Sequence, residues 1–314
     1  MKTIDVSIIL VNWNCGQVII DCIESLVKTI KAHTYEIIVV DNNSKDGSIQ
    51  EIEKKYPSIH LIKNDFNNMF AGANNQGYAI SKGKFIFILN SDTIVPNNSV
   101  DRLLDYAQNN NQDAMTCTLL NKDNSIQYNM HRGFPSFPRL FTSLFYKKFN
   151  LFGFLPIVKN YLLINNNFHE DFYVEQAAGA AILLKKDIVN KIGGYLFDEK
   201  NYPLFFNDVD LCYRLLKEKY KILCKTNVKI YHLKGTAINK MNFFDHWFNY
   251  GISCMRFFRL NKMYIDYLLI AITFKVAFSL NFLISLIEML LNRITYSELK
   301  KRMLIIEKVV LERF

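Results

Sequence analysis

The feature that most constrains the fold is an alternation of apolar runs and amphipathic segments between residues 6 and 89. The runs "VSIILV", "EIIVV", "IHLIKN" and "FIFIL" are the expected strands. The segments between them repeat apolar residues at helical spacing, as in "GQVIIDCIESLVKTI". Strands that are apolar along nearly their whole length are typical of a parallel sheet covered by helices on both faces. The order therefore predicts an α/β fold with a Rossmann-like, mostly parallel sheet.

The pattern is weaker after residue 94. We expect helices at "VDRLLDYAQNN" and "DVDLCYRLLKEKY", and strands at "AAILLKK", "KILCK" and "VKIYHL". Residues 121–175 are rich in Asn, Phe and Pro with little periodicity, and long irregular segments of this kind are often functional. The composition shifts near residue 240, which predicts a first domain over residues 1–240 and a helical extension over residues 241–314.

The extension contains a long apolar run at residues 267–287, with Lys275 as its one charge. Its length could span a bilayer as a helix, but a central lysine costs about 2.5–3.5 kcal/mol on insertion. One helical stripe of polar residues fits a helix lying in the membrane plane or one packed on the domain: Asn281, Ser285, Glu288 and Asn292. We expect in-plane membrane association, with nearby cations on lipid phosphates: Arg256, Arg259 and Lys262. "TYSE", residues 295–298, has capping-box spacing and opens a last helix.

Charge and cysteine content narrow the class of protein. Lys and Arg outnumber Asp and Glu by 38 to 29, so the surface attracts phosphates, nucleic acid or anionic lipid. The basic residues are dispersed, and the densest basic and aromatic patch adjoins the apolar run, so we expect no nucleic-acid partner. The six cysteines lack CxxC or zinc-ligand spacing, which favours reduced, buried thiols in a cytosolic protein. "VSIILV" is too short for a signal peptide and is interpreted as a strand.

Polar residues follow three of the expected strands: "VNWN", "DNNSKDGS" and "NSDT". In open α/β sheets, ligands bind outside the carboxyl ends of the strands, and parallel connectivity brings these ends to one edge. Asp41 and Asp92 could each cap the following helix instead. Because three clusters converge on one edge, we favour a ligand-binding crevice over caps.

The kind of ligand follows from what the crevice lacks. "FAGANNQG" has no Gly-Lys-Ser/Thr, so phosphates are not held as in a P-loop. A metal ion held by carboxylates is the other common way to hold a diphosphate, and Asp92 is the expected ligand. Downstream, Asp208 and Asp210 are helix N-terminal caps or include a general base that the aromatic residues before them shield from water. His232 is a core residue unless its strand reaches the crevice.

Eight motifs in order resemble one known family: "SIILVNWN", "EIIVVDNNSKDGS", "FAGANNQG", "FILNSDT", "AAGAAILLKK", "GGYLFDE", "NDVDLCYRL" and "YHLKGTA". Over residues 4–240 the chain is similar to glycosyltransferase family 2, whose members have the GT-A (nucleotide-diphospho-sugar transferase) fold. Within it, the chain most resembles the rhamnosyltransferase-like branch that builds bacterial surface polysaccharides. The resemblance implies an inverting glycosyltransferase with a divalent cation, Mn²⁺ or Mg²⁺.

The resemblance also implies roles for individual residues. Asp41 matches the aspartate that binds the nucleotide base, and Asp208 matches the base that deprotonates the acceptor hydroxyl. Asp92 and His232 match metal ligands. The remaining donor-binding assignments are Val11, Asn12, Asn43, Gly72, Asn74, Asn75, Asn90, Ser91 and Arg132. The assignments to the acceptor or sugar lining are Gly179, Ala180, Asn207 and Asp210.

Two residues depart from the family pattern. Asn90 stands where the first acid of the DxD motif is found, which leaves fewer carboxylates for the metal. Asn207 stands where relatives usually have Glu. A neutral neighbour removes a repelling charge, so we expect this substitution to lower the pKa of Asp208.

The implied reaction moves a sugar from a nucleotide-diphosphate donor, dTDP-rhamnose or a UDP-hexose, to a lipid-linked glycan or polysaccharide acceptor. The expected location is the cytoplasmic face of the plasma membrane, peripheral or in-plane. One alternative is a sugar nucleotidyltransferase, although such enzymes usually have a Gly-rich loop where this chain has "NWNCGQ". The other is a non-catalytic nucleotide-sugar-binding assembly protein, for which Asn207 is the best support.

Overall fold

The computed structural model describes residues 3–128, 130–149, 151–164, 166–233 and 243–311. Its contacts divide the chain into two units, Met1–Ala237 and Ile238–Phe314. This division and the predicted one after residue 240 both lie outside the described residues. The predicted domain boundary therefore stays a prediction, as does the structure of the "KGTA" part of the last motif.

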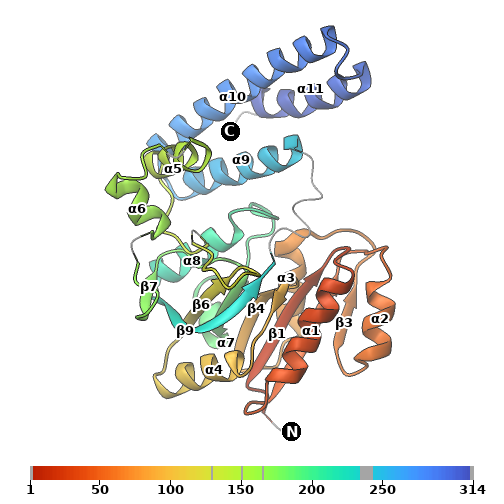
Figure 1. Ribbon diagram of the computed structural model, residues 1–314, viewed down its shortest axis with the longest axis vertical. Helices are drawn as coiled ribbons and strands as arrows, with labels where there is room; N and C mark the ends of the chain where they lie inside the picture. The colour runs from red at the N-terminus through yellow and green to blue at the C-terminus, as the bar shows by residue number, and fades with distance from the viewer. Residues whose placement is uncertain (1–2, 129, 150, 165, 234–242, 312–314) are drawn as a thin grey trace. The chain divides into compact units, whose positions relative to one another are not determined.

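The first unit begins with the predicted parallel strands (Figure 1). These are β1 (Val6–Asn12), β2 (Tyr35–Asp41), β3 (His60–Lys63) and β4 (Phe85–Asn90). β1 pairs in parallel with β2 on one side and β4 on the other, with Asn12 opposite Asp41 and Val11 opposite Asn90. Consecutive polar strand ends are thus neighbours on one edge of the sheet, as predicted.

The rest of the sheet mixes directions. Its strands are β5 (Thr93–Ile94), β6 (Ala114–Leu120), β7 (Phe172–Val174), β8 (Ala181–Lys185) and β9 (Ile222–His232). The order is β3-β2-β1-β4-β8-β6-β9-β5, and β7 pairs with β9. β8 runs antiparallel to β4 and β6, whereas β9 runs parallel to β6. Six of the nine strands run in one direction and β8, β5 and β7 in the other, so the sheet is mixed, and the predicted α/β fold class is confirmed.

Two sequence-based expectations for these strands were wrong. "KILCK" and "VKIYHL" form the single strand β9. The reason is its pairing with β6, which continues across a register shift from Cys117 opposite Lys225 to Thr118 opposite Lys229. β6 was not expected at all, although all seven of its residues are buried.

Helices cover both faces of the sheet. One core cluster packs the first face against α1 (Gln17–Thr29), α2 (Ser48–Lys55) and α4 (Ser99–Asn109). The other packs the opposite face against α3 (Met69–Ile80), α7 (Lys186–Lys191) and α8 (Asn207–Lys217). Alternation along the strands divides the two clusters, since Ile8 and Leu10 belong to the first and Ile9 to the second.

Residues 121–175 are less irregular than expected. They contain α5 (Phe137–Phe149), α6 (Pro156–Leu162) and β7. Phe137, Phe141 and Phe145 stack at successive four-residue spacings, with ring centroids 5.4 and 4.9 Å apart. This repeat has helical period, so the Phe-rich composition concealed a helix.

The second unit consists of α9 (Phe243–Leu260), α10 (Tyr264–Leu290) and α11 (Tyr296–Leu311). The predicted cap is present, since Thr295 Oγ1 accepts a hydrogen bond from Glu298 N at 3.2 Å. Two residues of the predicted polar stripe contact α11: Arg302 on α11 binds Glu288 at 2.7 Å and Ser285 at 3.3 Å, whereas Asn281 bonds within α10 and Asn292 lies beyond its end. α10 is long and apolar enough to cross a membrane by length and composition.

Candidate active site

The Asp41 cluster joins the carboxyl ends of β1 and β2. Asn12 donates from Nδ2 to Asp41 Oδ1 at 2.9 Å and to Ser48 Oγ at 2.9 Å. Asp41 Oδ2 accepts from Ser44 N at 3.0 Å. Asn12 is fully buried and Asp41 is 4% exposed. Both carboxylate oxygens of Asp41 are therefore held by the loops of the sheet edge.

Neither Asp41 nor Asp92 is a helix cap. The N-cap of α2 is Gly47 and that of α4 is Asn98, and neither helix has a side-chain cap hydrogen bond. Asp208 differs, because it lies in the first turn of α8 and its Oδ1 accepts from Val209 N at 2.9 Å. The cap interpretation thus holds in part for Asp208 and fails for the other two acids.

The Asp92 cluster is assembled from β4, β5 and β9. β5 pairs with β9 so that Thr93 lies opposite His232, and Leu233 N donates to Asp92 O at 2.8 Å. His232 Nε2 lies 3.3 Å from Asp92 Oδ1 and 3.3 Å from Asn90 Nδ2. His232 is buried, as a core histidine would be, but its strand also reaches the sheet edge beside Asp92.

The Asp92 cluster fits a divalent cation by the chemistry of its donors. A carboxylate and an imidazole directed at one point are ligand types that Mn²⁺ accepts, and the carboxylate suits Mg²⁺. Among the described residues there is no group of three or more His, Cys, Asp or Glu that could hold a metal. Asp92 and His232 would thus be a two-residue set, with the remaining positions open to diphosphate and water.

Asp208 lies beside Gly179 in the loop that precedes β8. Gly179 N donates to Asp208 Oδ2 at 3.2 Å. A Cβ at Gly179 would lie 3.4 Å from Asp208 Cβ and 3.7 Å from the Phe70 ring, so the backbone approaches the acid closely. Burial raises the pKa of Asp208, while these backbone hydrogen bonds and the charge of Arg132 act to lower it. The structure thus brings Asp208, Gly179 and Arg132 together.

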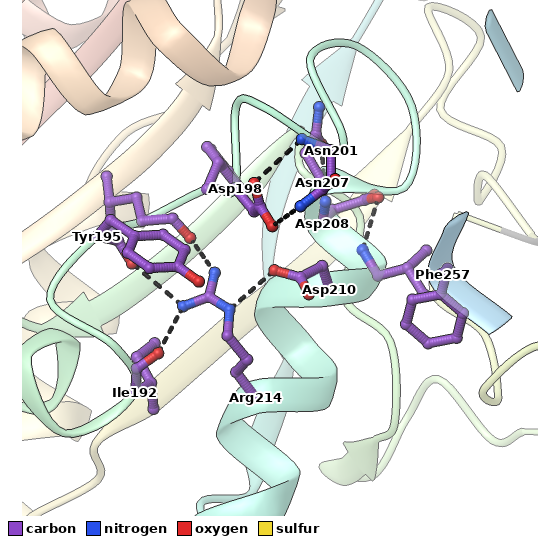
Figure 2. A network of polar contacts seen from close by, with 12 residues as sticks. Ile192, Tyr195, Asp198, Asn201, Asn207, Asp208, Asp210, Arg214 and Phe257 are labelled. Carbon is purple, nitrogen blue, oxygen red and sulfur yellow. Dashed lines mark hydrogen bonds and ion pairs between the residues drawn. The ribbon is translucent and has the colours of Figure 1, made fainter. Parts of the chain in front are cut away.

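Asp210 and Asn207 have other partners (Figure 2). Asp210 Oδ2 accepts from Arg214 Nε at 2.8 Å, and Arg214 also donates to Ile192 O at 2.8 Å. Asn207 donates from Nδ2 to Leu204 O at 2.8 Å and accepts from Asp208 N at 2.7 Å. Both side chains therefore hold loop backbone near α8, and their assignment to the acceptor lining stays a prediction. The predicted effect of Asn207 on the pKa of Asp208 also stays a prediction, because burial is the largest cause of the shift in that pKa.

The residues predicted on "FAGANNQG" lie within α3. Asn75 accepts from Phe197 N at 3.0 Å and donates to Phe197 O at 2.8 Å, so it anchors the "GGYLFDE" loop. Asn74 is 1% exposed, and its Oδ1 has no hydrogen-bond partner among the described residues. A Cβ at Gly72 would lie 2.9 Å from the Asn68 side chain. Asn75 and Gly72 thus have structural contacts, and their donor-binding roles stay predictions.

The other predicted residues lie along the same sheet edge. Ala180 O accepts from Asn90 N at 3.0 Å, next to Val11 on β1. Ser91 Oγ lies 3.3 Å from Cys15 Sγ. Asn43 donates to Asp65 O at 2.6 Å. Asn12 contacts Asp41, the adjacent Val11 pairs with Asn90, and Asn90 is linked through Ala180 and Gly179 to Asp208, so the three predicted acids lie around the same end of the sheet.

Three buried polar residues at the site were not predicted. Asn42 accepts from Asn64 and Asn68 and donates to Met69 O, which holds the start of α3. Gln127 contacts His232. His131 lies 2.8 Å from Cys117 O and accepts from Ala178 N at 3.2 Å; its burial lowers its pKa to about 4. Asn42 adjoins Asp41 and His131 adjoins Arg132 in the sequence, and this adjacency to predicted site residues is the sequence signal that could have identified them.

Comparisons with known proteins show which family the sequence matches. A family model described as Glycosyl transferase family 2 matches residues 7–165. The chain is 32% identical over 116 residues to poly(ribitol-phosphate) beta-N-acetylglucosaminyltransferase TarP of Staphylococcus aureus, covering 35% of each protein. It is 40% identical over 89 residues to the beta-1,3-glucosyltransferase WfaP of Escherichia coli, whose name specifies UDP-Glc and alpha-D-GlcNAc-diphosphoundecaprenol. That match covers 28% of this chain and 35% of WfaP, so the matched parts span about a third of these relatives.

The fold is also shared with solved structures. The crystal structure of S. aureus TarS 1–349 in complex with UDP-GlcNAc superposes with a TM-score of 0.54 at 13% identity. The match covers 81% of this chain and 67% of TarS 1–349. At this identity the likeness shows the fold.

Proposed function

Because the chain belongs to glycosyl transferase family 2, we propose that it transfers a sugar from a nucleotide-diphosphate donor to a glycan acceptor in cell-surface polysaccharide synthesis. The observation that supports this most is the placement of Asp41, Asp92 with His232, and Asp208 around the same end of the sheet. The names of TarP and WfaP specify N-acetylglucosamine and glucose transfer. These names favour a UDP-hexose donor over dTDP-rhamnose.

The donor would lie across the strand ends. Asp41, fixed by Asn12 and Ser44, would accept hydrogen bonds from the nucleotide base. The diphosphate would lie at Asp92 and His232. A divalent cation held by these two side chains would neutralise charge on the leaving diphosphate. Arg132, whose charge already acts on Asp208, would add a positive charge between the diphosphate and the acceptor.

Asp208 would act as the general base. Burial raises its pKa, which makes it a stronger base than an exposed aspartate. It would take the proton of an acceptor hydroxyl as that oxygen forms a bond to the anomeric carbon. The bond from this carbon to the diphosphate oxygen breaks on the opposite face, so the configuration inverts and the proton remains on Asp208.

The second unit would bring the enzyme to the membrane. Apolar side chains of α10 recur at helical spacing and are exposed: Ile272 at 50%, Val276 at 54%, Leu283 at 54% and Ile287 at 55%. Two residues of the polar stripe contact α11. We infer that this apolar stripe lies in the plane of the cytoplasmic leaflet, with basic side chains on lipid phosphates, and that the acceptor is lipid-linked.

Flotation of the full chain with vesicles tests the membrane proposal. Binding is expected to phosphatidylglycerol-containing vesicles and to fall at least about tenfold in the I272D/L283D double variant, which places two charges on the exposed stripe. A double variant at exposed residues of the first unit, Tyr128 and Tyr173 changed to Ser, is the matched control. Unchanged flotation of I272D/L283D would contradict the proposal.

A donor screen tests the activity. The purified chain is incubated with a panel of nucleotide sugars and lipid-linked acceptors, with Mn²⁺, Mg²⁺ or EDTA, and release of nucleoside diphosphate is measured. We expect release from one donor with a cation and little release with EDTA. Pyrophosphate release from a nucleoside triphosphate would favour a nucleotidyltransferase. Nucleotide binding without any release would favour a non-catalytic assembly protein.

A further inference from the structure

Gln127 is a buried amide in the turn that follows β6. It is 4% exposed, and its backbone N donates to Leu119 O at 2.8 Å. Its side-chain nitrogen contacts Leu120 O at 3.1 Å and also His232 O. Carbonyl oxygens only accept hydrogen bonds, so the NH₂ group must face them whichever way the amide is assigned. The orientation of the Gln127 side chain is therefore fixed by its surroundings.

This orientation determines the tautomer of His232. Gln127 Oε1 lies 3.1 Å from His232 Nδ1 and, as an acceptor, requires a proton on that nitrogen. In a neutral imidazole, Nε2 then carries the lone pair. That nitrogen is the one 3.3 Å from Asp92 Oδ1 and 3.3 Å from Asn90 Nδ2. His232 is thus held with its basic nitrogen directed at the Asp92 carboxylate.

The Nε2 lone pair of His232 and the carboxylate of Asp92 are two ligand atoms that one divalent cation can bind together. We propose that Gln127 is a positioning residue that fixes His232 as an Nε2 ligand, so that His232 and Asp92 bind one divalent cation. This inference rests on the proposed function and adds to it the residue that prepares the cation site. A hydrogen bond from the second nitrogen of a ligand histidine is the usual way to orient the ring and raise its basicity.

The substitution of Asn90 makes this support more important. With an amide at the first position of the DxD-type motif, the described residues of the cluster offer the cation one carboxylate, Asp92, beside the His232 imidazole. Each remaining ligand then contributes a larger share of the affinity. Loss of an outer-shell partner typically costs 10–100-fold in metal affinity.

The experiment measures Mn²⁺ binding to the full chain by the electron paramagnetic resonance signal of free Mn²⁺, with and without UDP. The variants are Gln127→Met, Gln127→Glu, His232→Ala and the H232A/Q127M double variant. We expect Q127M to weaken Mn²⁺ binding about 10–100-fold. Q127E loses the NH₂ donor to Leu120 O and His232 O but keeps an acceptor facing Nδ1, so it should bind Mn²⁺ more tightly than Q127M, which loses both. The double variant should bind no more weakly than H232A, because Gln127 acts through His232.

Each outcome separates this inference from the proposed function. No Mn²⁺ binding by the unmodified chain would contradict the cation in the proposed function. If Mn²⁺ binding falls in H232A but not in Q127M, the role of Gln127 is wrong while the proposed function stands. The same holds if Q127M weakens binding further in the H232A background, because Gln127 would then act independently of His232. Nitrogen-15 spectra of the unmodified, metal-free chain give a readout that needs no variant: a His232 proton on Nε2 rather than Nδ1 would overturn the inference.

Discussion

The Asp41 and Asp92 clusters lie on one sheet edge but satisfy their polar atoms in opposite ways. At Asp41, the last residue of β2, Asn12 at the end of β1 and Ser44 in the following loop each donate to one carboxylate oxygen. At Asp92, the carboxylate faces a histidine nitrogen that carries a lone pair in the tautomer favoured by Gln127. The first cluster is a closed hydrogen-bonded scaffold, and the second is the proposed cation site. A binding surface and a cation site can thus share one edge.

A second contrast lies at the N-terminus of α8. Asp208 and Asp210 are two positions apart, and burial raises the pKa of both. Asp210 is paired with Arg214, whereas Asp208 is held by the backbone N–H groups of Gly179 and Val209. The paired acid stabilises a loop, and the acid on backbone donors is the one suited to accept a proton.

Asp208→Asn tests this contrast with the largest expected effect. We expect sugar transfer to fall about 10²–10⁴-fold, because the general base is lost. Asp210→Asn is the matched control and should lose stability by about 1–3 kcal/mol while transfer at 25 °C stays within a few-fold. Full transfer by D208N would show that Asp208 is not the base. Assays of nucleoside diphosphate release and urea unfolding measure the two effects.

The pH dependence of the free energy of unfolding tests the contribution of His131, which accepts a hydrogen bond from Ala178 N next to Gly179 and Asp208. His131 has a pKa of about 4 in the folded chain and about 6.5 when unfolded. The folded state therefore binds fewer protons, so stability is complete above pH 6.5 and falls as the pH drops toward 4. The expected loss is about 3 kcal/mol. Urea unfolding at pH 7 and pH 4.5 measures it, and a His131→Gln variant should show a smaller difference. An equal difference in both proteins would exclude His131 as the cause.

Asp41→Asn tests the closed cluster. The amide keeps the shape of the carboxylate but weakens its hydrogen bonds, so we expect KM for the nucleotide sugar to rise about tenfold with kcat little changed. Kinetics with the donor from the screen measure this. A fall in kcat without a change in KM would show that Asp41 acts on the reaction and not on donor binding.

Ser44→Ala is expected to have the smallest effect. Ser44 Oγ accepts from Asn14 N at 2.8 Å and lies 3.1 Å from Asn12 Nδ2, so its loss should cost about 1 kcal/mol of stability. Donor KM should remain nearly unchanged, because Asn12 and the Ser44 backbone N still hold Asp41. A larger change in KM than in D41N would mean that the cluster is not closed. Urea unfolding and donor kinetics check both values.

Local sequence patterns were sufficient for the first half of the sheet. Continuous apolar runs and helical repeats predicted β1 to β4 with their helices, and the parallel order predicted that Asn12, Asp41 and Asn90 are neighbours. They failed at β6, although Thr116 and Thr118 alternate with apolar residues there, and at α5, whose aromatic repeat resembled an irregular segment.

The sequence by itself determined the α/β class, the parallel strands and the acids at their ends, because each of these depends on residues close together in the chain. Only the tertiary structure decided which side chains meet those acids. His232 reaches Asp92 because β9 keeps pairing with β6 across a register shift, and Gln127 then fixes the ring. Arg214 pairs with Asp210, so Asp208 is the acid that remains for the proposed role of general base. Such contacts depend on strand register and packing between distant segments, which no local period encodes.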